Sequence, residues 1–88
     1  MNIILTDNIM ENHISLNNMR AVLKNTPIIN IDKANLDIKN GTVTYNGQVI
    51  YREIVKKVWI RVNTYSAKLY SYMQFFTYYE FNNRSYEW

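Results

Sequence analysis

Residues 51–79, YREIVKKVWIRVNTYSAKLYSYMQFFTYY, decide the fold of this chain, because their composition and their spacing favour different structures. Val, Ile, Tyr, Phe and Thr are frequent here, and these residue types favour strands. The spacing of the apolar residues fits the helical increment of about 100° per residue better than it fits strand alternation. The apolar stripe on the helical projection consists of Tyr51, Ile54, Val55, Val58, Val62, Tyr65, Leu69, Tyr72, Met73, Phe76 and Tyr79. Because the charged side chains fall outside this stripe, we predict helix.

A single helix over residues 51–79 would be about 43 Å long, at about 1.5 Å per residue. The folded chain should measure only about 30 Å across. Asn63-Thr64 is the natural break, since Asn favours helix C-termini and Thr favours N-caps. We therefore predict helices near residues 50–62 and 65–80. An unbroken helix would expose apolar surface and imply a homodimer or a bound partner.

The N-terminal half contains a further helix pattern. Its apolar spacing predicts a helix over residues 9–24 that Asp7 caps, or a shorter helix over residues 16–25 that Ser15 caps. Either helix ends before Pro27, because the residue before proline is disfavoured in the α region.

Short strands are predicted at Asn2–Thr6, Pro27–Ile31, Leu36–Lys39, Thr42–Tyr45 and Gln48–Tyr51. The pairs Asn40-Gly41 and Asn46-Gly47 separate the last three strands. Asn-Gly suits the positive φ angles of a tight hairpin turn. The last three strands should therefore form a meander.

These elements predict an α+β fold, in which a small antiparallel meander packs on one N-terminal and two C-terminal helices. The alternative is a mostly β meander, in which residues 55–81 form a hairpin. The length of 88 residues fits one domain over residues 1–88.

Composition excludes several kinds of site. The chain has no cysteine, which excludes disulfide scaffolds, iron–sulfur clusters and thiol nucleophiles. His13 is the only imidazole, and a surface role fits it better than metal binding, so neither a metal nor a cofactor is predicted. Asp32, Asp37 and Glu53 are interpreted as solvated turn residues rather than an acid–base pair. We therefore expect a protein that is not an enzyme.

The positive charge is concentrated in the C-terminal half. The net charge is +3, and residues 52–68 carry five Lys or Arg against the single acid Glu53. Such a stretch favours nucleic acid or an acidic protein partner. One alternative is a small metal-independent ribonuclease toxin, in which Arg52, Lys56 and Arg61 would surround a phosphate together with tyrosines. No motif in the sequence supports this alternative.

A second face of the predicted C-terminal helices combines cations with rings. It consists of Lys57, Ile60, Arg61, Lys68, Phe75 and Tyr78. We predict that this aromatic–basic face binds a partner protein, with the rings as anchors. Direct RNA or DNA binding is the first alternative, with stacking on the rings. The others are interfacial membrane binding and burial of both helix faces in a core.

The residue usage indicates an origin. Asn occurs 13 times and Ile 11 times, whereas Gly, Ala, Arg and Pro together occur 10 times. This bias is typical of an AT-rich genome, such as that of a low-GC bacterium or its phage. We therefore expect a small phage or mobile-element protein that binds and blocks a host protein or protein–nucleic acid complex, for example a defence or transcription component. Because no apolar run reaches membrane-spanning length and no signal peptide is visible, the expected location is the cytoplasm.

Overall fold

A computed structural model describes residues 1–76 and 80–81, and this part of the chain forms two sheets and two α-helices. The element order is β1 (Asn2–Thr6), α1 (Ile14–Val22), β2 (Ile28–Asn30), β3 (Asn35–Asp37), β4 (Thr42–Tyr45), β5 (Gln48–Tyr51), the 3-10 helix η1 (Arg52–Ile54), β6 (Lys57–Ile60), α2 (Ala67–Phe75) and β7 (Glu80–Phe81). This mixture of strands and helices agrees with the predicted α+β class.

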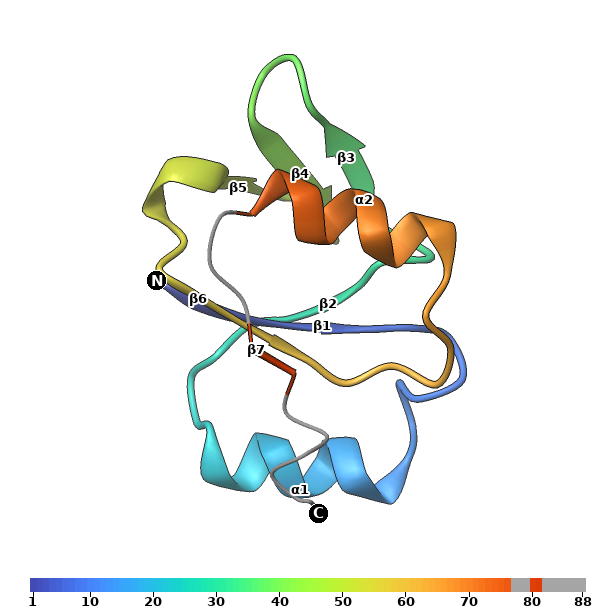
Figure 1. Ribbon diagram of the computed structural model, residues 1–88. Coiled ribbons are helices and arrows are strands. Elements are labelled where there is room, and N and C mark those ends of the chain that lie inside the picture. The colour runs from blue at the N-terminus through green and yellow to red at the C-terminus, as the bar shows by residue number, and fades with distance from the viewer. Residues whose placement is uncertain (77–79, 82–88) are drawn as a thin grey trace.

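The larger sheet is parallel, which the sequence analysis did not predict. Its strands lie in the order β2-β1-β6-β7, and every neighbouring pair is parallel. Parallel neighbours require a crossover connection. Here α1 connects β1 to β2 and α2 connects β6 to β7, and the two helices cover opposite faces of the sheet (Figure 1). The central strands are therefore buried on both sides.

Each face of the parallel sheet has its own hydrophobic core. On the α1 face, Ile4 packs with Leu16 and Met19. On the α2 face, Leu5 and Ile60 belong to a larger core that also contains residues of α2 and of the meander. Alternate residues of one strand thus enter different cores, and this is possible only because helices cover both faces.

The smaller sheet is the meander β3-β4-β5, and its neighbours are antiparallel. The observed bounds of β4 and β5 are the predicted ones. Between them, Asn46 and Gly47 have φ of 52° and 76°. Asn and Gly tolerate this left-handed region better than other residue types. Val43 and Ile50 pair across the two strands and face the α2-side core.

The predicted helix near residues 50–62 is wrong. These residues form the end of β5, the short η1 and the strand β6. Val58 and Ile60 both point into the same buried core, as strand alternation requires, and β6 lies between β1 and β7. The alternative hairpin over residues 55–81 is also wrong, because α2 is helical. The chain changes from strand to helix after the predicted break at Asn63-Thr64, although Ser66 is the N-cap.

Both α-helices of the described part are nine residues long. α1 begins at Ile14, so neither predicted helix start is correct. Its N-cap is His13, whose Nδ1 accepts a 3.1 Å hydrogen bond from the backbone N–H of Ser15. Within residues 1–76 and 80–81, no helix has the length and apolarity required to cross a bilayer.

Candidate functional site

The predicted aromatic–basic face is divided between the two sides of the parallel sheet. Lys57 lies on the α1 side, where its Nζ is 4.5 Å from the centre of the Trp59 ring. Ile60 points to the other side and is only 1% exposed. Arg61 follows the end of β6 and is half-buried. The prediction that Ile60 is an exposed partner-binding residue is therefore wrong.

The remaining members of that face belong to α2 or follow it. Phe75 is 4% exposed, so its predicted exposure is also wrong. Its ring packs edge to face against Phe76, with centroids 4.9 Å apart, and the Arg52 guanidinium lies 5.0 Å from its centre. Lys68 is exposed on the first turn of α2. Tyr78 lies outside the described residues.

The polar residue Asp7 occupies the carboxyl edge of the parallel sheet. Ligands of open parallel sheets usually bind at this edge, between the strands where the connections diverge in opposite directions. Here those strands are β1 and β6, and Asp7, which is 7% exposed, directly follows β1. Its carboxylate accepts hydrogen bonds from the backbone N–H groups of Met10 at 2.9 Å, Asn63 at 2.8 Å and Thr64 at 3.3 Å. Asp7 therefore connects the two loops that leave this edge.

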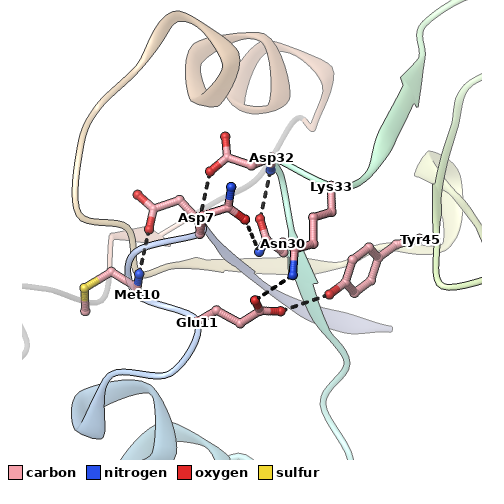
Figure 2. Close-up of polar contacts among 8 residues, drawn as sticks. Asp7, Met10, Glu11, Asn30, Asp32, Lys33 and Tyr45 are labelled. Atoms are coloured by element: carbon pink, nitrogen blue, oxygen red, sulfur yellow. Dashed lines mark hydrogen bonds and ion pairs between the residues drawn. The ribbon is translucent and has the colours of Figure 1, made fainter.

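Asp32 is the centre of a second set of hydrogen bonds at the same edge (Figure 2). Its carboxylate accepts a bond from the backbone N–H of Asn8, and its own N–H donates to the side chain of the buried Asn30, each at 2.9 Å. Asn30 in turn donates to the Asn8 side chain at 2.9 Å. These bonds hold the loop after β1 against the loop after β2.

Glu11 joins this edge to the meander. Lys33 Nζ lies 3.1 Å from Glu11 Oε1, and the Tyr45 hydroxyl donates to Glu11 Oε2 at 3.3 Å (Figure 2). The hydrogen bond from Lys33 lowers the pKa of Glu11, and the same bond raises the pKa of Lys33. Burial raises the pKa of Tyr45. The Glu11 carboxylate is thus ionised at neutral pH, and it accepts hydrogen bonds from Lys33 and Tyr45 that connect the loop to the meander.

The other titratable groups considered from the sequence have local roles. Asp37 accepts hydrogen bonds from the backbone and side chain of Asn40, and His13 caps α1. No group of three His, Asp or Glu in the described part of the chain could hold a metal ion. Arg52 precedes the amino end of β6 and Arg61 follows its carboxyl end, so the strand separates two of the cations suggested for a ribonuclease.

A groove runs between α2 and the segment of residues 31–38. Its first part has a volume of about 420 Å³ and lies between residues 31–36 and the first two turns of α2. Its second part, about 270 Å³, is lined by Ile38, Arg52, Ser71, Gln74 and Phe75. Because Ser71 lines both parts, we treat them as one site, the α2 groove. In Figure 1, α2 lies alongside the meander, of which β3 supplies lining residues of the groove.

A cation stands at each end of the α2 groove. Lys68 lines the first part, and its Nζ lies 4.0 Å from Asp32 Oδ1. Arg52 lines the second part and lies over the Phe75 ring. The rim there is apolar, since Ile38 is 66% exposed. The groove therefore presents a cation at each end. Between them lie the apolar side chains of Ala34 and Leu36 together with polar side chains such as Ser71.

The wall of the groove contains the phenol of Tyr72. This side chain is 2% exposed, and burial raises the pKa of Tyr72 to about 12. Within the described part of the chain its hydroxyl has no hydrogen-bond partner. Because the pKa of Tyr72 lies far above 7, its phenol is protonated at neutral pH and can donate a hydrogen bond. Sequence reasoning named Lys68 and Phe75 but missed Tyr72 as a site residue, since its place on the apolar stripe indicated only burial.

Comparison of the chain with models of protein families, with curated proteins and with solved structures finds no match.

Proposed function

We propose that this chain is a small non-enzymatic interaction protein that binds and blocks another macromolecule through the α2 groove. The observation that carries the proposal is that the groove combines apolar surface with a cation at each end, Lys68 and Arg52. Rings and Arg side chains are enriched at protein interfaces, where a few of them supply most of the binding energy. Arg52 is exposed at the groove and is held over the buried Phe75 ring, so it is the side chain of this kind that a partner can contact.

The carboxyl edge of the parallel sheet supports the same proposal. A general acid or base must be free to reach a substrate. Asp7, Asp32 and Glu11 instead accept hydrogen bonds from the protein itself. Their arrangement fits a structural role better than a catalytic one.

The partner is proposed to be a host macromolecule. The codon bias that the Asn and Ile content implies favours a phage or mobile-element gene, and the product of such a gene acts in the host cytoplasm. Defence and transcription components are the partners that we propose first. Binding would block the partner sterically, while the cations Lys68 and Arg52 accelerate association with an acidic surface.

The test uses immobilised protein and a lysate of an AT-rich bacterium, with and without nuclease treatment. The groove variant carries Arg52→Glu and Lys68→Glu. The control variant carries Arg20→Glu and Lys24→Glu, which change the net charge equally at exposed positions near the end of α1. We expect a host protein that the wild-type chain and the control retain and the groove variant loses.

Equal retention by the groove variant would contradict the proposal. Retention that disappears after nuclease treatment would contradict it too, and would instead favour direct binding of nucleic acid. Circular dichroism on each variant confirms that the charge changes leave the fold intact.

A further inference from the structure

The free edge of β3 borders the α2 groove. β3 pairs with β4, and among the described strands it has no neighbour on its other side. Asn35 and Leu36 of β3 line the first part of the groove, and Ile38, just after β3, lines the second. A free strand edge presents backbone N–H and C=O groups that an extended peptide can pair with.

From this arrangement we infer that the α2 groove takes an extended peptide with the pattern acid–x–apolar–x–acid, which adds as a strand beside β3. The inference rests on the proposed function and specifies the partner's binding segment. The backbone pairing supplies affinity, and the side chains that face α2 supply specificity.

The spacing of the two cations sets the spacing of the two acids. Lys68 and Phe75 are seven residues apart on α2, which corresponds to about 10.5 Å along the helix axis. The Arg52 guanidinium lies over Phe75. In an extended chain, residues i and i+4 point to the same side and lie about 13 Å apart. The flexible side chains of Lys68 and Arg52 can span the difference of about 2.5 Å between the spacing along α2 and the spacing of the two acids.

The chemistry of the two ends suits carboxylates. Among the described residues Arg52 makes no ion pair, and its planar guanidinium can bind a carboxylate through two parallel hydrogen bonds while it stacks on Phe75. Lys68 contacts Asp32 at 4.0 Å, and its ammonium group, with three donors, keeps donors for a second acceptor.

The middle of the groove suits an apolar side chain and one acceptor. Ala34 and Leu36 are half-buried and form the wall on the β3 side. Opposite them, the hydroxyl of Tyr72 can donate to a backbone carbonyl of the peptide. The residue between the two acids therefore meets apolar surface.

A peptide fits this site better than a nucleic acid does. Nucleic-acid binding draws its affinity from several phosphate contacts. The groove offers two separated cations, and Asp32 lies beside one of them. A continuous chain of phosphates would meet this carboxylate and the apolar middle.

The test uses the full chain labelled with ¹⁵N and the peptide acetyl-Gly-Asp-Thr-Val-Thr-Glu-Gly-amide. We expect it to shift the backbone amide signals of residues 34–38 and to slow hydrogen exchange in β3. A control peptide with Asn and Gln in place of the two acids should bind roughly tenfold more weakly or worse. A peptide with Glu moved one residue toward Asp should also lose affinity, because that carboxylate then points to the other side.

The protein variants Arg52→Gln and Lys68→Gln should each weaken binding of the acidic peptide roughly tenfold. Lys56→Gln is the matched control, since Lys56 is exposed in the same basic stretch but does not line the groove, and its affinity should not change. Because the peptide series uses the unaltered protein, the test does not depend on the folding of any variant.

The inference is overturned if the acidic peptide does not bind, or if the Asn/Gln peptide binds equally well. It is also overturned if oligo(dT) shifts the same amide signals and the acidic peptide does not. The proposed function fails separately, when the groove variant with Arg52→Glu and Lys68→Glu still retains the host protein.

Discussion

Asp7 accepts a 2.8 Å hydrogen bond from the backbone N–H of Asn63, although the two residues are 56 positions apart in the sequence. The bond joins the loop after β1 to the loop after β6 at the place where an open parallel sheet usually binds its ligand. A structural carboxylate thus occupies this edge, whereas the proposed partner site is the α2 groove.

The first prediction concerns this carboxylate. Asp7→Ala should lower the free energy of unfolding by about 3 kcal/mol, because it leaves partly buried N–H groups without an acceptor. Urea denaturation measures the change. Asp37→Ala, which removes an exposed acceptor for Asn40, should change the stability by only about 0.5 kcal/mol. Equal effects of the two substitutions would show that Asp7 has no special structural role.

The second prediction concerns the pH dependence of the Glu11–Lys33 pair. The pKa of Glu11 in the folded protein lies below the ordinary value of 4.5. The unfolded chain therefore binds the proton first as the pH falls. The stability that the pair contributes is present above pH 4.5 and is lost as the pH falls through the lowered pKa of the folded state.

Glu11→Gln removes this contribution. Between about pH 7 and pH 3, wild-type protein should therefore lose more stability than the variant, by no more than about 1 kcal/mol because the pair is partly exposed. Urea denaturation at the two pH values measures the difference. Parallel losses in the two proteins would contradict the assignment.

The third prediction concerns Tyr72, whose pKa burial raises to about 12. The unfolded chain ionises this phenol first, at about its ordinary value of 10. The stability that the neutral phenol contributes is therefore complete below pH 10 and is lost as the pH rises toward 12.

Over this range wild-type protein should lose about 2 kcal/mol more stability than the Tyr72→Phe variant. The comparison is made by urea denaturation at several alkaline pH values, and it separates Tyr72 from the other tyrosines because the variant keeps them. If both proteins lose stability in parallel, Tyr72 is not the group responsible.

The fourth prediction compares two isoleucines that the fold treats differently. Ile60 is 1% exposed and Ile38 is 66% exposed. Ile60→Ala should reduce the free energy of unfolding by about 3 kcal/mol, because it removes buried methyl groups and leaves a cavity. Ile38→Ala should cost less than about 0.5 kcal/mol. Thermal or urea denaturation distinguishes the two, and a similar cost for both would contradict the placement of β6 in the core.

The sequence predicted only some of the residues that line the α2 groove. Lys68 and Phe75 were expected to belong to a partner-binding face, and both line the α2 groove. Ile60 and Phe75 were expected to be exposed, and both are buried. The groove joins residues 31–38 to α2, and no spacing within either segment indicates that the two meet.

Local physical chemistry was enough for several elements. Three strands have their predicted bounds: Asn2–Thr6 and the two strands on either side of Asn46-Gly47. Strand propensity and the tolerance of Asn and Gly for positive φ depend only on residues close together in the sequence, so the sequence alone could predict them. The helical spacing after Asn63 likewise indicated α2.

The tertiary structure alone decided the state of residues 57–60. Their pattern of Lys, Val, Trp and Ile is compatible with a helix as well as with a strand. They form a strand because β1 pairs with all four residues on one side, β7 pairs with Trp59 and Ile60 on the other, and the two α-helices cover both faces, so that Val58 and Ile60 are buried and Trp59 is half-buried. That choice divided the predicted aromatic–basic face between the two sides of the parallel sheet.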